Sequence, residues 1–389
     1  MKKFLAVFMA LAMVFCFAAC GGDKSGHADN EVYIGGIGAL TGDYANYGLS
    51  VQHGAEVAVE EINAAGGING MKIVFNMQDS QADPESAKSA YGKLIDWGMD
   101  ISIGTVMSGE MASVSQESAN DDMFMISPSA SADKCLEASS NAFRVCFYDS
   151  YQGIAAADYV KENLSGKKVA VFYQSDIDYS VGLYESFKTQ AANDGVEIVA
   201  EQSFTSDEKD YTTQINALAD SGAEVIFIPI YAAEASMFLS QAKNGTDSAV
   251  FADGVYFFGC DGLDGILGKV AGNESTANNV LMLTPFAESS TDPAVVKFVN
   301  AYKEKTGSVP DQFAADGYDA VYVIKAALEA MSITKSSEIS GAKVSATVAG
   351  DGFAYEGVTG EMTWEANGNT NKLAMAIIYN DGVGTVFGE

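Results

Sequence analysis

The chain has 389 residues, of which 48% are apolar and 19% are charged, and its formal net charge is −30 at pH 7. This composition is ordinary for a globular protein and excludes intrinsic disorder, and the length suggests about two domains. The large negative charge excludes nucleic acid and anionic lipid head groups as binding surfaces.

The N-terminal segment predicts export. Lys2 and Lys3 precede an unbroken apolar run over residues 4–18, which is too short and wrongly flanked to span a membrane. A positive start, an apolar middle and small residues before a cleavage point are typical of a secretory signal. We therefore interpret residues 1–19 as a signal peptide.

The end of this signal contains the sequence Ala18-Ala19-Cys20-Gly21. It resembles a bacterial lipobox, which implies a diacylglyceryl group on the sulfur of Cys20. Residues 20–30 then form a polar tether, and we expect the folded body to lie at the outer face of a bacterial membrane. The alternative is an ordinary signal peptide with an incidental cysteine.

Strand and helix patterns alternate along the rest of the chain. The first helix carries Val51, Ala55, Ala58 and Ile62 on one face, near the 3.6-residue period. Repeated βα units predict a parallel sheet with helices on both faces, and the pattern restarts after Asp149, which predicts a second such sheet. We expect strands at 32–38, 72–78, 101–104, 123–126, 168–173, 197–204, 224–229, 255–258 and 279–284, helices at 51–62, 84–97, 110–120, 152–163, 181–193, 211–220, 232–242, 294–305 and 314–331, and a hairpin at 372–387.

One motif suggests an enzyme. The glycines Gly36, Gly38 and Gly42 are one residue off the dinucleotide-binding fingerprint, Asp79 ends the next strand, and Tyr184-x-x-x-Lys188 has the spacing of short-chain dehydrogenases. However, no helix begins at the glycines, so no helix N-terminus would meet a pyrophosphate. An NAD-dependent reductase is therefore a remote alternative, and we expect no cofactor and no enzymatic activity.

The cysteine and histidine content of the chain argues against a metal site. There is no CxxC motif, and the only histidines are His27 and His53, so we expect no metal site. Export permits a disulfide between Cys135 and Cys146, which would close a short loop. The alternative is that these thiols and Cys260 stay reduced.

Six segments in chain order resemble one known family. They are IGGIGALTGDYANYGLSVQHGAEVAVEEINAAGGINGMKI, SIGTVMSGEMASVS, MFMISPSASAD, FRVCFYDSYQG, GYDAVYVIKAALE and GVTGEMTWEANGN. Together they resemble the branched-chain amino acid binding proteins of ABC importers, which have the type I periplasmic-binding fold. The resemblance implies two doubly wound α/β lobes joined by three crossovers. We expect lobe 1 to contain residues 31–149 and 284–357, and lobe 2 to contain residues 150–283 and 358–389.

The resemblance also implies a binding site between the lobes. Family members hold a ligand carboxylate with hydroxyls and backbone N–H groups of two loops, which correspond here to Ser108, Ser129 and Ser131. Loops after the carboxyl ends of parallel strands are where such sheets bind ligands. The ligand ammonium corresponds to a second set of residues, and the ligand side chain to a third. These are Tyr179, Tyr231 and Asp261 for the ammonium, and Tyr47 and Met107 for the side chain.

The sequence therefore predicts a monomeric solute-binding lipoprotein. It would capture an amino acid by hinge closure of two lobes and deliver it to ABC permease subunits, and the family resemblance implies a branched-chain amino acid. Two alternatives remain within the same fold. One is a binder of another small amide or acid, and the other is the ligand-binding component of a sensor.

Overall fold

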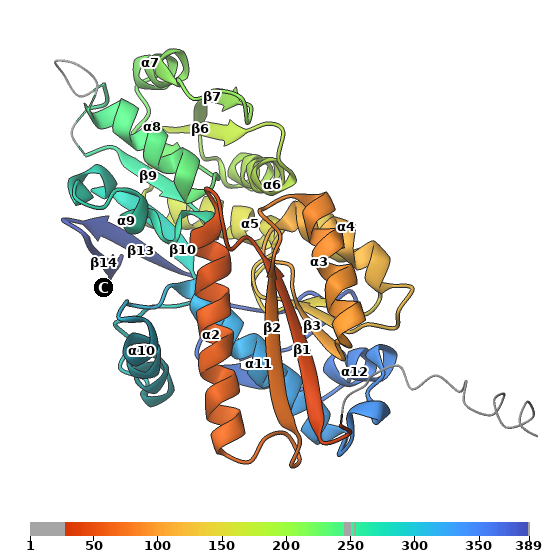
Figure 1. The fold of residues 1–389 in the computed structure, drawn as a ribbon. Helices are drawn as coiled ribbons and strands as arrows, with labels where there is room; N and C mark the ends of the chain where they lie inside the picture. Colours follow the sequence, from red (N-terminus) through yellow and green to blue (C-terminus); the bar gives the residue numbers. More distant parts are fainter. Residues whose placement is uncertain (1–27, 245–249, 253, 388–389) are drawn as a thin grey trace, which may run out of the picture.

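A computed structural model describes residues 28–244, 250–252 and 254–387 of the chain. Two α/β lobes lie one above the other, with the long helix α2 (Ala45–Ala64) reaching from the lower lobe towards the upper one (Figure 1). The lower lobe is lobe 1 and the upper lobe is lobe 2. The predicted fold class, two doubly wound lobes, is confirmed.

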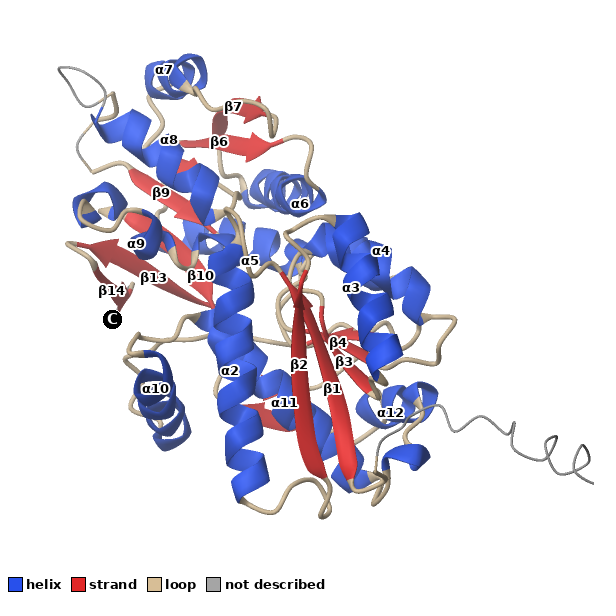
Figure 2. Cartoon of the chain, viewed as in Figure 1, coloured by secondary structure: helices blue, strands red, loops and turns tan. Residues whose placement is uncertain are grey.

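Lobe 1 is built on a five-stranded, fully parallel sheet with the order β2-β1-β3-β4-β5. Helices cover both of its faces, as Figure 2 shows. The strands are β1 (Glu31–Gly38), β2 (Lys72–Asp79), β3 (Ile101–Gly104), β4 (Met125–Ser127) and β5 (Ala142–Arg144), and the further helices are α3 (Pro84–Trp97), α4 (Ser108–Ser118), α10 (Pro293–Thr306), α11 (Gln312–Ala330) and α12 (Gly341–Val348).

Helix α11 returns to lobe 1 late in the chain and packs against α2. The approach is close: a Cβ on Gly54 or Gly317 would collide with the backbone of the opposite helix at Ala314 or Val51. The sequence also marks where these helices start. Asp83, before α3, and Asp311, before α11, each accept a hydrogen bond from a backbone N–H of the first turn.

Lobe 2 is built on a seven-stranded sheet with the order β14-β13-β10-β9-β8-β6-β7. The strands from β10 to β7 are parallel, and β13 and β14 add an antiparallel hairpin at one edge. Its strands are β6 (Val169–Gln174), β7 (Ile198–Phe204), β8 (Val225–Phe227), β9 (Tyr256–Gly259), β10 (Val280–Thr284), β13 (Met375–Asn380) and β14 (Val383–Val386), and its helices are α5 (Asp149–Asn163), α6 (Asp178–Asp194), α7 (Thr212–Asp220), α8 (Ala232–Asn244) and α9 (Ile266–Lys269).

Every strand and helix range that the sequence predicted corresponds to an element of the structure, and so does the C-terminal hairpin. Besides short 3-10 helices, the described residues add two α-helices and three strands that were not predicted: α9, α12, β5, and an antiparallel ribbon of β11 (Tyr355–Gly357) and β12 (Gly360–Met362). These elements have three to eight residues each, which is too short for a clear periodic pattern.

The chain passes between the lobes after β5, after β10 and before β13. The third passage lies later than the sequence suggested, because the segment after residue 357 remains bound to lobe 1. Val358 and Thr359 donate backbone hydrogen bonds to Asp319 of α11, and Gly368 accepts one from the backbone of Arg144. The boundary that we placed at 357/358 is therefore too early.

The suggested disulfide is absent: Cys135 and Cys146 are both free and buried. Their surroundings differ. The Cys135 thiol packs in the apolar cluster beside α3 and α4 and donates to the Ala130 carbonyl at 3.5 Å. Burial raises the pKa of both thiols, and the charges that act on Cys146 include Arg144 and Asp316. The short separation of the two cysteines in the sequence therefore suggested a bond that the structure does not contain.

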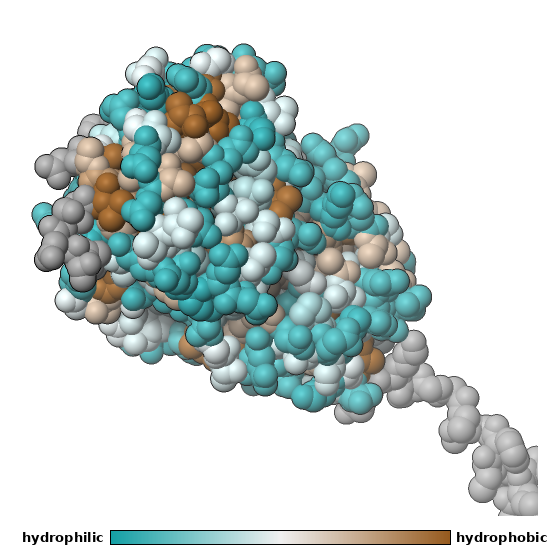
Figure 3. All heavy atoms as spheres, turned by 90° about the horizontal axis from the view of Figure 1, so that it is seen from above, coloured by the Kyte–Doolittle hydropathy of each residue, from teal (hydrophilic) through white to brown (hydrophobic). Residues whose placement is uncertain are grey.

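The surface is mostly polar, with small apolar areas scattered between polar ones on the face seen in Figure 3. Within the described ranges, no helix combines the length and the apolar character needed to cross a membrane. The predicted signal peptide and Cys20 lie outside the described residues.

Candidate ligand-binding site

A small cavity lies between the lobes, at the carboxyl ends of the parallel strands of both sheets. This is the edge at which open parallel sheets bind ligands. It is lined by Tyr47, Val106, Met107, Ser129, Ser131, Tyr179, Tyr231, Asp261, Gly262 and Phe313. All of the sequence-predicted site residues except Ser108 are in this lining.

Two loops of lobe 1 carry the serines, and hydrogen bonds join these loops. The Ser129 hydroxyl donates to the Val106 carbonyl at 2.7 Å, and the Ser108 hydroxyl accepts from the Ala132 N–H at 3.1 Å. Ser108 is the first residue of α4, so the free N–H groups of that helix start lie beside it. Such a helix start favours an anion.

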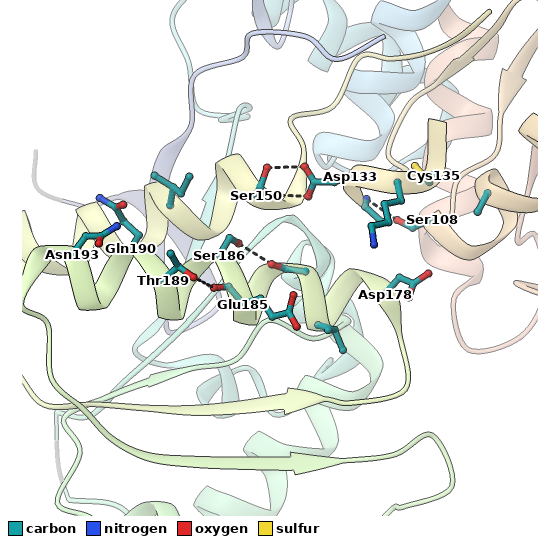
Figure 4. Close-up of a pocket in the computed structure, with 16 residues that line it drawn as sticks. Ser108, Asp133, Cys135, Ser150, Asp178, Glu185, Ser186, Thr189, Gln190 and Asn193 are labelled. Carbon is teal, nitrogen blue, oxygen red and sulfur yellow. Dashed lines mark hydrogen bonds between the residues drawn. The ribbon is translucent and has the colours of Figure 1, made fainter. Parts of the chain in front are cut away.

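Ser108 faces a second, open cavity of about 530 Å³ next to the first. Figure 4 shows this groove, with Ser108, Asp133 and Cys135 of lobe 1 across from side chains of α5 and α6. Asp133 spans the groove, because its carboxylate accepts hydrogen bonds from the Ser150 hydroxyl and N–H. Ser108 thus stands at the border of the two cavities.

Lobe 2 contributes an aromatic and acidic wall. The rings of Tyr179 and Tyr231 stack with centroids 4.5 Å apart and an interplanar angle of 7°. Asp261 accepts a hydrogen bond from the Tyr179 hydroxyl at 2.8 Å and another from the Gly262 N–H. Burial raises the pKa of Asp261 to about 6, although these hydrogen bonds oppose the shift. A buried carboxylate against aromatic faces suits a ligand cation.

Tyr47 joins the two lobes. Its hydroxyl donates to the Gly262 carbonyl at 2.7 Å and accepts from the Ala232 N–H at 2.8 Å, so one side chain of α2 holds two loops of lobe 2. Its ring packs edge-on against Phe313 with centroids 4.7 Å apart. We expected Tyr47 only as a pocket wall, and the structure gives it this bridging contact as well.

The sequence prediction missed Arg144, which organises the serine loop. Its side chain is fully buried, and its guanidinium donates to the carbonyls of Ala130, Ser131 and Ala132. Arginine suits this position because its planar group offers five donors in a fixed arrangement. A signal was present, because Arg144 is the only arginine in the chain.

Three further residues were also missed: Asp149, Gln152 and Phe313. The Gln152 amide oxygen accepts a hydrogen bond from the Asp261 N–H at 3.1 Å, and Phe313, the second residue of α11, lies in the cavity wall. Asp149 is fully buried beside Ser131. Nothing in the sequence marks Gln152 or Phe313, but Asp149 falls at the point where the helix–strand pattern restarts.

A family model described as periplasmic binding protein matches residues 31–382. The chain belongs to this family. The family resemblance inferred from the sequence is thereby confirmed. A Leu/Ile/Val-binding protein homolog from Brucella melitensis is 30% identical over 375 residues, which cover 96% of this chain and 97% of that protein.

Solved structures agree with this family assignment. The branched-chain amino acid transporter substrate binding protein LivJ from Streptococcus pneumoniae, in complex with isoleucine, is 27% identical with a TM-score of 0.81, over 91% of this chain and 97% of that one. A solute binding protein from R. palustris in complex with benzoate has a TM-score of 0.79 at 20% identity, over 92% of this chain and 96% of that one. The second likeness shows the fold alone.

In this periplasmic binding protein, the residues that suggested a reductase have packing roles. A Cβ on Gly36 or Gly38 would collide with Met77, and helix α2 begins only at Ala45. Asp79 accepts hydrogen bonds from the Leu40 N–H and the Thr41 hydroxyl in the loop that follows β1. On the outer face of α6, Tyr184 and Lys188 both contact the carboxylate of Glu201. None of these residues lines the cavity between the lobes.

Proposed function

We propose that this solute-binding protein captures an α-amino acid, with a branched-chain amino acid as the first candidate, and delivers it to an ABC importer. The observation that carries the proposal is the pairing of two opposite walls. Lobe 1 presents serine hydroxyls and the start of α4, which suit a carboxylate, and lobe 2 presents Asp261 on Tyr179, which suits an ammonium. The names of the Brucella and Streptococcus relatives support the same ligand class.

An aromatic acid is the second candidate, because the R. palustris protein with the same fold was solved with benzoate. Asp261 argues against it here. A ligand with a carboxylate and no cationic group would leave this buried acid without a counter-charge, which is costly in a site that excludes water. A sensor component with the same site would take the same ligand, and we favour delivery because the relatives' names refer to binding and transport.

Calorimetric titration tests the ligand class. The wild type should bind L-leucine or L-isoleucine, and should reject 4-methyl-2-oxopentanoate and benzoate, which lack the ammonium. Asp261→Ala should weaken L-leucine at least thirtyfold, because stranding one member of a buried charge pair costs about 2–5 kcal/mol, and Asp261→Asn should fall between. Asp207→Ala, an exposed acid of the same lobe, is the control. Equal affinity of Asp261→Ala and wild type refutes the amino acid assignment.

We further propose that lipid on Cys20 anchors the protein to the outer face of the membrane. The proposal rests on the lipobox-like sequence Ala18-Ala19-Cys20-Gly21. Cys20→Ser should release the protein from membranes with its thermal unfolding unchanged. Mass spectrometry of membrane-extracted protein should show a lipid adduct at Cys20, and an unmodified protein that begins at another residue contradicts the anchor.

A further inference from the structure

A third cavity lies between the lobes, apart from the two described above. It has a volume of about 450 Å³ and shares no lining residue with either of them. Lobe 1 contributes Asn46 of α2 and the loop before α11, and lobe 2 contributes α9 and the β13–β14 hairpin. Figure 1 shows α9 and this hairpin above α10, to the left of α2. Because both lobes form its walls, the shape of this cavity depends on their closed arrangement.

Much of the wall of this third cavity is apolar. Val309 of lobe 1 and Val383 of lobe 2 line it while remaining 54% and 60% exposed, so they stand at its opening. The deeper lining can therefore cover a short hydrocarbon chain, and covering apolar surface is favourable. The further apolar lining residues are Leu267, Met282, Phe286, Pro310 and Ile377.

Three carboxylates line the same cavity: Asp264, Glu288 and Asp311. Asp264 accepts a hydrogen bond from the Gln312 N–H at 2.8 Å and Asp311 accepts one from the Ala314 N–H at 2.9 Å, so both lie at the first turn of α11. A helix start supplies only about half a positive charge. None of the three acids forms an ion pair with a described residue. The site therefore carries more negative charge than the helix balances.

Asn46 adds an independent sign of a ligand. Its side chain lines the cavity, and both polar atoms of its amide are buried without a hydrogen-bond partner among the described residues. The amide lies against the start of α9, because a Cβ added to Gly265 would be 3.1 Å from its Nδ2 atom. Buried polar atoms without a partner are few in native proteins, so this amide indicates that a polar group binds beside it.

The chemistry of the lining favours an organic cation over a metal ion. Hard metal cations need about six or more oxygen ligands, which a mostly apolar wall does not supply. In the part of the chain that the structure describes, no group of acidic, cysteine or histidine side chains is arranged to hold a metal ion. An alkylammonium, in contrast, has three N–H donors for carboxylate and amide oxygens and a chain for the apolar wall.

We propose that this third cavity is a second ligand site, which binds a primary ammonium on a short alkyl chain. The ammonium lies at Asp264, Asp311 and Glu288, and the chain packs towards Val309 and Val383. The inference goes beyond the proposed function and does not depend on it. Because both lobes form the site, a cation bound there favours the closed form and strengthens capture of the first ligand by the same factor in return.

The probe for this site is n-butylammonium, and its control is butan-1-ol, which has the same chain without the charge. Calorimetric titration into protein saturated with L-leucine should show saturable binding of n-butylammonium and none of butan-1-ol, at equal ionic strength. Asp264→Asn should weaken the probe by roughly tenfold or more, and Glu288→Gln, at an exposed position, by roughly threefold or more. Glu304→Gln, an exposed acid of α10 outside the cavity, is the matched control and should leave the Kd unchanged.

Two results overturn the inference. One is the absence of saturable binding, or equal binding of n-butylammonium and butan-1-ol. The other is equal affinity of the wild type, Asp264→Asn and Glu288→Gln for the probe. If Asp264→Asn does not fold, Glu288→Gln decides, because its side chain is exposed. If the wild type binds no L-leucine, the proposed function fails, and titration of n-butylammonium into the ligand-free protein and these variants decides the second site.

Discussion

The hydroxyl of Tyr47 is the sharpest test of lobe closure, because one atom joins two loops of the opposite lobe. Tyr47→Phe keeps the ring, with its packing against Phe313, and removes only that oxygen. In the closed form the Gly262 carbonyl and the Ala232 N–H then lose their partner, and both are buried. In an open form, water can replace the hydroxyl as the hydrogen-bond partner of both groups. Removing the hydroxyl therefore destabilises the closed form and leaves the open form almost unchanged.

The size of the effect follows from these two hydrogen bonds. Each contributes about 0.5–1.5 kcal/mol net, and a buried group left unpaired costs roughly 1–3 kcal/mol. We expect closure to weaken by about 2–4 kcal/mol, which corresponds to a loss of ligand affinity of roughly 30- to 900-fold. Isothermal titration with L-leucine measures it, and the unfolding free energy of the unliganded protein should change by less than this amount.

Tyr91→Phe is the control for losing a tyrosine hydroxyl. Its hydroxyl donates to Asp121 at 3.0 Å within lobe 1, so its loss should leave the Kd unchanged. A Kd for Tyr47→Phe within threefold of wild type refutes the reasoning that this hydroxyl stabilises the closed form.

Two further predictions concern buried charge. Arg144→Met removes the donors to three buried carbonyls and the cation near Asp149. We expect urea denaturation to show that the free energy of unfolding falls by about 3–5 kcal/mol, with Arg144→Lys between this variant and the wild type. A fall of less than about 1 kcal/mol would contradict this role. Asp264 of lobe 2 accepts from the Gln312 N–H of lobe 1 at 2.8 Å, and burial followed by the charge of Asp311 raises its pKa, with Glu288 adding to the shift. We expect the contact with Gln312 to break when the lobes open, so that water lowers the pKa of Asp264 and closure takes up a proton. The favourable contribution of this proton uptake to closure is complete at low pH and is lost as pH rises through the raised pKa. Titration with L-leucine from pH 5.5 to 8.5 should show weaker binding at high pH, and Asp264→Asn should flatten that slope; an equal slope in both proteins rules out Asp264 as its source.

The sequence predicted the fold well where elements are long. Helices such as α3 and α11 combine a clear apolar period with a capping acid, and both signals are local. The short β5, the β11–β12 ribbon and α9 have no such period, so only the packed lobes define them. The third crossing was placed too early for a related reason, since Asp319 binds Val358 and Thr359 across about forty residues of sequence.

The candidate site also has residues that the sequence could predict and residues that it could not. The loops with Ser129, Ser131 and Asp261 could be placed, because they follow predicted strands and carry the family's motifs. The roles of Tyr47 and Arg144 could not, because each depends on groups that only the fold brings near. For Tyr47 these groups lie more than 180 residues away in the chain. The proposed disulfide failed likewise, since eleven positions of sequence separation say nothing about which way two thiols face.

The buried charges around the cavity suggest why ligand capture and closure are coupled. Lys372 neutralises Asp316 at 2.7 Å near the third crossing, and the guanidinium of Arg144 is occupied by carbonyls. Asp261 remains, a buried acid of lobe 2 that forms no ion pair among the described residues, and Arg144 lowers its pKa only without direct contact. On the proposed function a ligand ammonium supplies that charge, so the closed form is electrostatically complete only with an amino acid inside. Closure without the ligand buries Asp261 without that counter-charge, which disfavours closing on an empty site at neutral pH.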